Sequence, residues 1–304
     1  MQHDRRRSRT VVYVAAGANL SIATTKFVVA GVTGSSALFS EGFHSLVDTG
    51  NELLLLLGMG RSQRPPDREF PFGYSRELYF WSFIVALLLF GGGGALAIYE
   101  GISRLRHPIP LGHPLWAYVV IGAAATFETT SLITALRELE RQAMPGPLWQ
   151  KIHRSKDPAV FTVIIEDLAA LLGLAVAAIG VFLGHVFSTP RYDAGASIVI
   201  GLLLCGAALA LATESRSLLL GESAHPAVVN DIRAIVARDP RVESVRQPLT
   251  MQMGPQDVLL NLEVEFRPGI SADDHVEAIR SIEAEVRRRH PNIQRIFIEA
   301  RSRH

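Results

Sequence analysis

Long apolar segments alternate with short polar ones over the first two thirds of the chain, whereas the last third has the mixed composition of a water-soluble protein. A helix needs about 20 predominantly apolar residues to cross the core of a bilayer. Six segments approach this length, and turns rich in Gly and Pro separate them. The six predicted spans cover residues 10–32, 36–59, 78–101, 114–136, 158–186 and 193–213. The pattern predicts a polytopic α-helical membrane protein with six transmembrane helices.

Residues 222–304 form a second predicted unit, in which both helical and strand periodicities occur. Helices are expected at 226–238 and 272–290, and strands at 242–253, 258–266 and 293–299. The segment Gly254-Pro255-Gln256-Asp257 is a hairpin turn signal between the first two strands. Apolar side chains alternate along the second strand, at Val258, Leu260, Leu262 and Val264. Two helices on one face of an open three-stranded sheet give a small α+β domain.

The basic residues predict how the helices are oriented. Most of them precede the first span or lie in the second and fourth loops, namely Arg5, Arg6, Arg7, Arg9, Arg61, Arg64, Arg68, Arg76, Arg137, Arg141, Lys151, Arg154 and Lys156. The opposite side holds only Arg104, Arg106 and Arg191. By the positive-inside rule, both termini are cytoplasmic. The expected parts are a cytoplasmic segment 1–9, a six-helix transport domain 10–215 and a cytoplasmic domain 222–304.

Composition and cysteine content argue against several other classes of protein. Basic residues followed by an apolar run also characterise signal peptides. However, the run from Thr10 to Val32 is long enough to span a bilayer and no clear cleavage site follows, so it is interpreted as the first transmembrane helix. The single cysteine, Cys205, excludes a disulfide framework or a cysteine metal cluster within one chain. The net charge of +1 does not point to nucleic acid, and no nucleic-acid partner is expected.

Polar residues interrupt the second span in a pattern that suits metal binding. In the stretch SEGFHSLVDTGNE, residues 40–52, His44, Asp48 and Asn51 fall at i, i+4 and i+7, on one face of a helix. A histidine one turn before an aspartate is a good half-site for a divalent transition metal. Placing an ionisable residue at membrane depth costs free energy, so such a residue indicates a functional site. The alternative is a polar helix face buried against a neighbouring helix.

Other spans carry isolated ionisable groups. Glu128 lies near the middle of the fourth span, where it either carries protons or pairs with Lys26 of the first span. Glu166 and Asp167 stand together in the fifth span. Adjacent side chains on a helix point about 100° apart, so at most one of the two faces the second span comfortably. The other must meet a different partner, face water or stay protonated.

Three stretches of the chain together resemble the cation diffusion facilitators, a family of divalent metal/proton antiporters. These are SEGFHSLVDTGNE in the second span, PFGYSRELYFW before the third span, and VIIEDLAALLG in the fifth span. The resemblance covers nearly the whole chain. It implies six helices, cytoplasmic termini and a ferredoxin-like αββαβ tail that mediates homodimerisation.

The resemblance implies a transport site made of His44, Asp48 and Asp167. The family's usual fourth ligand lies four residues before the last of these, at Val163, which cannot coordinate. Glu166, Asn51 or water is then expected to complete the shell.

Two further metal sites of the family are not expected in this chain. In the loop before the third span Asp67 is present, but Phe70 and Tyr74 occupy the positions of the other ligands. In the tail the comparable positions hold Asn261 and Glu299, with His275 alone remaining, so no regulatory tail site is predicted.

The expected activity is export of a divalent cation, zinc first, from the cytoplasm in exchange for protons. A metal ligand must be deprotonated before it binds, so protons and metal compete at His44, Asp48 and Asp167. His44 is the natural proton carrier, because the unperturbed pKa of a histidine, about 6.5, lies nearest the working range. Manganese, cobalt or iron(II) are alternative substrates. The metal is the transported substrate, and no cofactor is expected.

Two other classes of function remain open at this stage. An intramembrane metalloenzyme could use Glu166 beside Asp167 as a general base, but no H-E-x-x-H pattern occurs, and a non-enzymatic carrier is expected. A non-transporting dimeric scaffold would use the polar groups to hold its helices together. The carrier is expected as a multi-pass homodimer in the inner membrane of the cell.

Overall fold

A computed structural model describes residues 19–109, 114–141 and 147–301. The first nine residues of the predicted first span, and the N-terminal segment before it, lie outside this range. The helical part begins with a helix over residues 19–33, called the N-terminal helix below. The helices that follow are α2 (Ser36–Ser62), α3 (Glu77–Leu88), a π-helical turn η1 (Leu89–Ala95), α4 (Leu96–Arg106), α5 (Leu115–Arg141), α6 (Leu148–Arg154), α7 (Pro158–Val186) and α8 (Arg191–Leu220).

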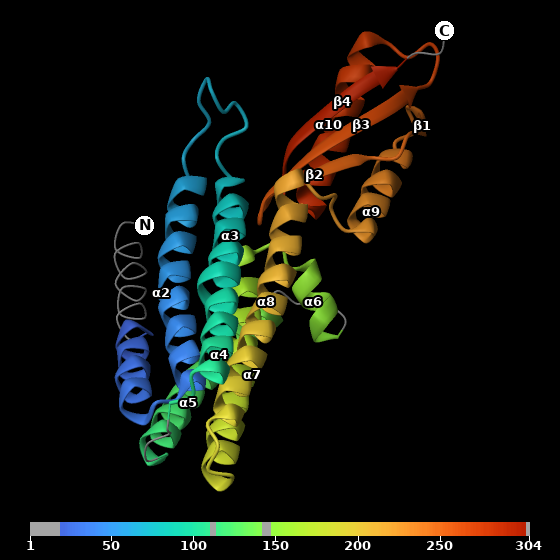
Figure 1. Cartoon of the computed structure of the whole chain (residues 1–304). Helices are drawn as coiled ribbons and strands as arrows, with labels where there is room; N and C mark the ends of the chain where they lie inside the picture. The colour runs from blue at the N-terminus through green and yellow to red at the C-terminus, as the bar shows by residue number, and fades with distance from the viewer. Residues whose placement is uncertain (1–18, 110–113, 142–146, 302–304) are drawn as a thin grey trace.

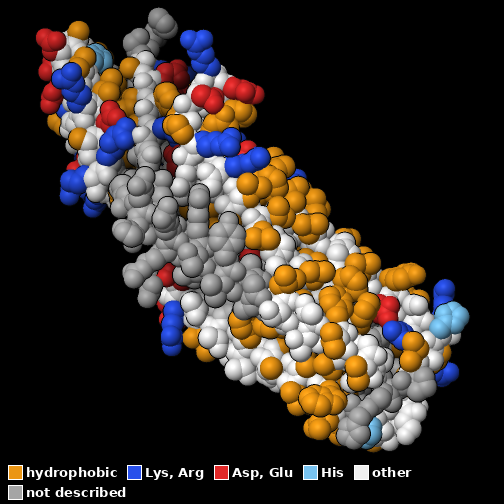
Figure 2. Space-filling view, turned by 90° about the vertical axis from the view of Figure 1, so that its left-hand side faces the viewer, with side chains coloured by type: hydrophobic (Ala, Val, Ile, Leu, Met, Phe, Trp, Pro, Cys, Tyr) orange, Lys and Arg blue, Asp and Glu red, His pale blue; other side chains and the backbone are white. Residues whose placement is uncertain are grey.

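Four of these helical segments are long and apolar enough to cross a membrane. They are Glu77–Arg106, Leu115–Glu140, Pro158–Val186 and Arg191–Leu220. Figure 2 shows that hydrophobic side chains cover much of one face of the helical part, whereas charged side chains gather towards one end of the molecule. An apolar outer surface suits lipid contact, since every helix satisfies its own backbone groups. The structure therefore has a membrane-type helical region.

The helices run alongside one another in a bundle, with the N-terminal helix beside α2 (Figure 1). The long helix α8 packs against α7, α4, α3 and α2, and α5 packs against α7. Glycines allow the closest of these contacts, because a Cβ at Gly94 would meet Cys205, and one at Gly201 would meet Ile98. Small residues at Gly94 and Gly201 thus let the two helices approach closely.

The last part of the chain is an α+β domain at one end of the bundle (Figure 1). It consists of α9 (Pro226–Ala237), β1 (Val242–Val245), β2 (Leu249–Gly254), β3 (Asp257–Phe266), α10 (Ala272–Arg289) and β4 (Ile293–Arg301). β1 and β2 pair antiparallel with β3, and β4 pairs parallel with β3. Apolar side chains of α9 and α10 share one core with the buried face of β3. Below, this unit is called the sheet domain.

The sheet domain differs from the prediction in its number of strands. The predicted strand 242–253 is two strands, so the sheet has four strands rather than three. Pro248 lies in the break and cannot donate to a strand ladder, which explains the interruption. The alternation along β3 is confirmed, because Val258, Leu260, Leu262 and Val264 are all buried. The hairpin turn is also confirmed, since Gly254 pairs with Asp257.

The loop between α2 and α3 connects the helical bundle with the sheet domain. Arg295 of β4 donates a hydrogen bond of 2.9 Å to the backbone carbonyl of Phe72 in this loop. Ser75 donates one of 3.2 Å to Asp257, the first residue of β3. A second connection is the ion pair between Lys156 and Glu222, with 2.8 Å between Nζ and Oε1. The end of α2 that follows His44 therefore leads towards the sheet domain.

Candidate metal centre

α2 brings the predicted half-site together. The Nδ1 atom of His44 lies 3.3 Å from Oδ1 of Asp48, one turn further along the helix. The imidazole is completely buried, and apart from this contact with Asp48 its ring nitrogens have no hydrogen-bond partner among the described residues. Metal ions bind the lone pair of a neutral imidazole, so a buried ring with a free nitrogen suits a ligand.

The start of α2 is held by a carboxylate from another helix. Asp193, in the first turn of α8, is buried and accepts hydrogen bonds from the hydroxyls of Ser35 and Ser36. It also accepts the backbone N–H groups of Ser36 and Ala37, which have no partner within their own helix. A negative charge is favourable at this positive end of the helix dipole. Asp193 thus fixes the position of the helix that carries His44.

A buried ion pair lies between this capped end and the half-site. The ammonium group of Lys26 in the N-terminal helix is 3.2 Å from Oε2 of Glu41 and donates a 2.8 Å hydrogen bond to Ser45. Both charged side chains are completely buried. The sequence left Lys26 as a possible partner for Glu128, but the structure pairs it with Glu41.

Beyond Asp48 the polar residues surround a small cavity of about 40 Å³. Five carboxylates from three helices line it, namely Asp48, Glu52, Glu128, Glu166 and Asp167. The lining is completed by Asn19, Ser45, Leu55, Phe127, Ser131 and Val163. A space of this size holds about one water molecule or a metal ion, since a water takes about 30 Å³ of the liquid. The cavity is therefore strongly acidic and too small for an organic substrate.

The two adjacent acids of α7 are used differently. Asn51 of α2 donates a 2.6 Å hydrogen bond to Oε1 of Glu166. Asp167 is also buried, and its Oδ2 atom has no hydrogen-bond partner among the described residues. The structure thus joins Glu166 to α2 by a hydrogen bond. Both acids nevertheless border the same cavity as Asp48.

The predicted ligands do not converge on one point in this conformation. Within the described ranges, no three His, Cys, Asp or Glu side chains lie close enough together to hold a metal ion. Asp48 touches His44, Glu166 touches Asn51, and Asp167 reaches the cavity from α7. Small side-chain movements around the cavity would be needed to complete a shell.

The sequence assigns no role to Glu52 or Asn19, although both line the cavity. Glu52 lies one turn after Asp48, so the spacing 44, 48, 52 could have identified it. Asn19 donates a 2.9 Å hydrogen bond to Glu52 from the N-terminal helix, a contact that no local spacing indicates. Glu128, predicted either to carry protons or to pair with Lys26, lines the cavity with them.

The residues at the family's other two metal sites have local contacts. Asp67 accepts hydrogen bonds from the backbone of Glu69 and Phe70 and from the hydroxyl of Tyr74. The Tyr74 hydroxyl, followed by the backbone N–H of Phe70, holds the pKa of Asp67 below its usual range. In the sheet domain, a ring nitrogen of His275 lies 2.9 Å from the carbonyl of Ser271. The absence of metal at these places stays a prediction.

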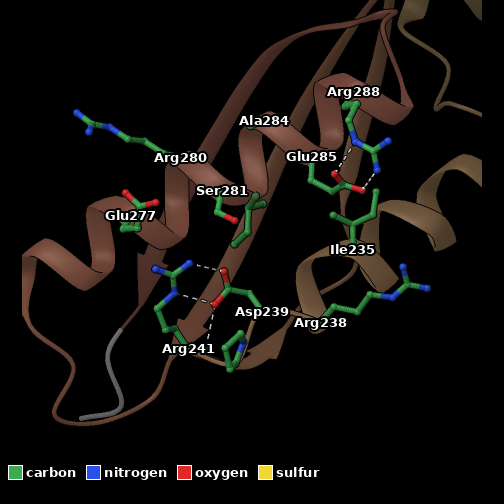
Figure 3. Close-up of a pocket in the computed structure, with 12 residues that line it drawn as sticks. Ile235, Arg238, Asp239, Arg241, Glu277, Arg280, Ser281, Ala284, Glu285 and Arg288 are labelled. Carbon is green, nitrogen blue, oxygen red and sulfur yellow. Dashed lines mark hydrogen bonds and ion pairs between the residues drawn. The ribbon is translucent and has the colours of Figure 1, made fainter.

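A wider groove of about 820 Å³ lies between α9 and α10 on the outside of the sheet domain (Figure 3). Its Asp239 and Glu285 side chains are paired with Arg241 and Arg288. These arginines hold the pKa of each carboxyl below its usual range. No His or Cys is among the residues that line the groove, so it lacks the donors that transition metals prefer.

Comparison with known proteins identifies the family. The cation efflux transmembrane domain matches residues 12–220, well over half of the chain. The chain belongs to the cation efflux family. This confirms the predicted cation diffusion facilitator, and the relatives of this cation efflux protein are transporters rather than enzymes.

Two curated relatives illustrate the range of the cation efflux family. The proton-coupled zinc antiporter SLC30A9 of Xenopus laevis is 33% identical over 247 residues, which cover 81% of this chain and 44% of the relative. The manganese efflux system protein MneP of Bacillus subtilis is 23% identical, with 96% of this chain and 95% of the relative covered. This cation efflux protein thus spans less than half the length of the zinc antiporter.

Among solved structures, a nickel form of the MamM C-terminal domain matches part of the cation efflux protein. It is 24% identical and covers 26% of this chain and 100% of that domain, with a TM-score of 0.25.

Proposed function

We propose that this chain exports a divalent transition-metal cation from the cytoplasm in exchange for protons, with zinc as the first candidate. The observation that carries the proposal is the buried acidic cavity beside His44, bordered by carboxylates from α2, α5 and α7. Membership of the cation efflux family supports metal transport. The zinc antiporter relatives support zinc, while the manganese efflux relative keeps manganese open, with cobalt and iron(II) as further alternatives.

The proposed ligands are His44, Asp48 and Asp167, with Glu166, Asn51 or water completing the shell. Imidazole and carboxylate together suit zinc, whereas oxygen ligands alone suit manganese or magnesium better. Each ligand has to lose its proton before metal binds. Competition between protons and metal at His44, Asp48 and Asp167 therefore couples the two flows in a carrier that alternates between the two faces.

The proposed arrangement has six spans with both termini in the cytoplasm. The N-terminal helix and α2 add two spans to the four apolar segments, and the basic residues set the orientation. The chain then divides into a transport domain, 10–215, and a cytoplasmic ferredoxin-like domain, 222–304, which pairs two copies into a homodimer. We propose the inner membrane of the cell as its location. The zinc antiporter relatives are mitochondrial, so a mitochondrial membrane is the alternative.

Uptake into proteoliposomes tests the proposal. The purified chain would be assayed with zinc, manganese and cobalt under an imposed pH gradient, alongside Asp48→Asn, Asp167→Asn and Glu166→Gln. Residues that only support a metal ligand typically contribute about 10–100-fold to metal affinity, so loss of a ligand should reduce transport at least as much. Glu100→Gln is the matched control, because Glu100 pairs with Arg104 on α4, away from the cavity.

Loss of zinc flux in both Asp48→Asn and Asp167→Asn, with Glu100→Gln active, is the expected result. A further loss in Glu166→Gln would assign both acids of α7 to the site. Flux in Asp48→Asn and Asp167→Asn equal to that of wild type would overturn the proposed ligand set. If no ion responds to the gradient in wild type, the carrier proposal fails and the scaffold alternative gains support.

A further inference from the structure

Two carboxylates in the cavity have no role in the proposed ligand set. Glu52 lies on α2 one turn after Asp48, and Glu128 lies near the middle of α5. Both line the cavity that Asp167 also lines. Three helices therefore supply oxygen ligands to one small space beside the His44–Asp48 pair.

The oxygens of Glu52 and Asp167 are only partly satisfied by the protein. Asn19 donates to Oε1 of Glu52, but Oε2 of Glu52 is buried without a hydrogen-bond partner among the described residues. Asp167 is 8% exposed, and its Oδ2 is likewise unpartnered where the structure describes its surroundings. The buried cation close by, Lys26, is already engaged by Glu41 and Ser45. Buried carboxylates without partners are costly, so these groups either bind a proton or accept a positively charged occupant.

The size and chemistry of the cavity limit this occupant to a small cation. About 40 Å³ excludes an organic amine or a lipid headgroup but admits a metal ion or a water molecule. Glu52, Glu128 and Asp167 offer oxygen atoms alone, and such ligands suit manganese, magnesium or calcium. Since no three acids converge among the described residues, a bound ion would keep water in part of its shell.

We propose that Glu52, Glu128 and the free Oδ2 of Asp167 form a second cation position, adjoining the His44–Asp48 pair, that holds a hard divalent cation through oxygen atoms alone. The inference deepens the proposed transport function and rests on it. The two positions differ in chemistry, one with an imidazole and one without. Since they share Asp167 and a cavity with room for about one ion, a cation occupies one of them at a time. The second position accepts manganese even when the imidazole is removed.

Manganese binding in a His44→Ala background tests this position separately from transport. The full-length chain in detergent would be titrated with Mn²⁺ and followed by electron paramagnetic resonance, which distinguishes free from bound ion. His44→Ala should still bind one Mn²⁺ per chain. Adding Glu52→Gln and Glu128→Gln should abolish this binding, whereas adding Glu100→Gln should leave it unchanged.

Single substitutions keep the test decisive if the triple variant does not fold. Glu128→Gln alone, in the same background, should raise the Kd for Mn²⁺ about tenfold. Glu128→Asp, which keeps the charge, should restore most of the affinity. A thermal melting curve of each variant verifies that it is folded, and if the triple variant is not, the Kd of Glu128→Gln decides.

The outcomes separate this inference from the proposed function. Equal Mn²⁺ binding with and without Glu52 and Glu128 overturns the second position, even if His44→Ala has lost zinc transport. Loss of all Mn²⁺ binding in His44→Ala alone also overturns it, because binding then requires the imidazole. Zinc transport by His44→Ala at the wild-type rate would instead contradict the proposed function, whatever the resonance measurement shows.

Discussion

The polar side chains of α2 have opposite environments on the two sides of His44. Before it, Asp193 caps the serines at the start of the helix, Ser40 bonds to Ser197, and Glu41 pairs with Lys26. After it, Asp48 and Glu52 line the cavity and carry buried oxygen atoms with no hydrogen-bond partner among the described residues. The first half is held to its neighbours by polar contacts and leaves one buried carboxylate oxygen, Oε1 of Glu41, without a hydrogen-bond partner among the described residues. The second half leaves one such oxygen on each of Asp48 and Glu52, beside the cavity.

This difference separates stability from function along a single helix. Satisfied buried polar groups rigidify a packed region, and unsatisfied ones cost free energy that a bound cation can offset. Substitutions before His44 should therefore lower the free energy of unfolding, whereas neutral substitutions after Asp48 should mainly affect metal binding.

Removing Lys26 should have the largest effect on stability. Lys26→Met leaves the Glu41 carboxylate buried without its ion partner, and breaking such a pair costs about 3–5 kcal/mol. Thermal and denaturant unfolding of the full chain in detergent would measure the loss. The double variant Lys26→Met/Glu41→Leu should recover most of it, because an apolar pair of similar volume replaces the ions. If Lys26→Met lowered the free energy of unfolding by less than about 1 kcal/mol, the pair would contribute no more than an exposed surface ion pair, contrary to this prediction.

Removing the cap on α2 should have the next largest effect. Asp193→Ala leaves the N–H and hydroxyl of Ser36 buried without their acceptor, at a cost of about 2–3 kcal/mol in the free energy of unfolding. Asp157→Ala is the matched control, since Asp157 caps α7 at a less buried position and its loss should cost about 1 kcal/mol. Both would be measured by the same unfolding assay. Equal losses in the two variants would argue against a special role for the capped end of α2.

Adding a methyl group against Glu41 should have a smaller effect. A Cβ at Gly173 of α7 would overlap Oε1 of Glu41, so the buried carboxylate must shift in Gly173→Ala, at a cost of about 1–3 kcal/mol. Gly206→Ala is the control, because its Cβ would meet nothing within 4 Å and alanine favours a helix. Melting temperatures of the two variants should therefore shift in opposite directions. A higher melting temperature for Gly173→Ala would show that the space around Glu41 is not tightly packed.

Local patterns predicted the elements of the fold better than their boundaries. Apolar length and turn signals located α5, α7 and α8, and period-two alternation identified the buried face of β3. The short helix α6, Leu148–Arg154, was not predicted, because seven residues carry too little periodicity. The break between β1 and β2 could have been expected from Pro248.

The candidate site was predictable only where its contacts are local. The His44–Asp48 contact follows from i, i+4 spacing. The hydrogen bond from Asn51 to Glu166 joins residues 115 positions apart, and the bond from Ser36 to Asp193 spans 157. Such partners depend on how helices pack, which one sequence does not specify. The acidic cavity itself became visible only when three helices were assembled.

Asp67 lies outside the membrane region, and the smallest effect is expected there. Its carboxylate is exposed and accepts a hydrogen bond from Tyr74, unlike the buried carboxylates of α2. The hydroxyl of Tyr74 lowers the pKa of Asp67 below the ordinary value of about 3.9. The stabilisation from ionised Asp67 is therefore complete above about pH 4 and is lost as the pH falls through the lowered pKa. Tyr74→Phe should raise this pKa towards the ordinary value, as followed by the carboxyl ¹³C shift of Asp67, assigned with Asp67→Asn. An unchanged midpoint in Tyr74→Phe would mean that the backbone N–H groups of Glu69 and Phe70 alone hold the charge.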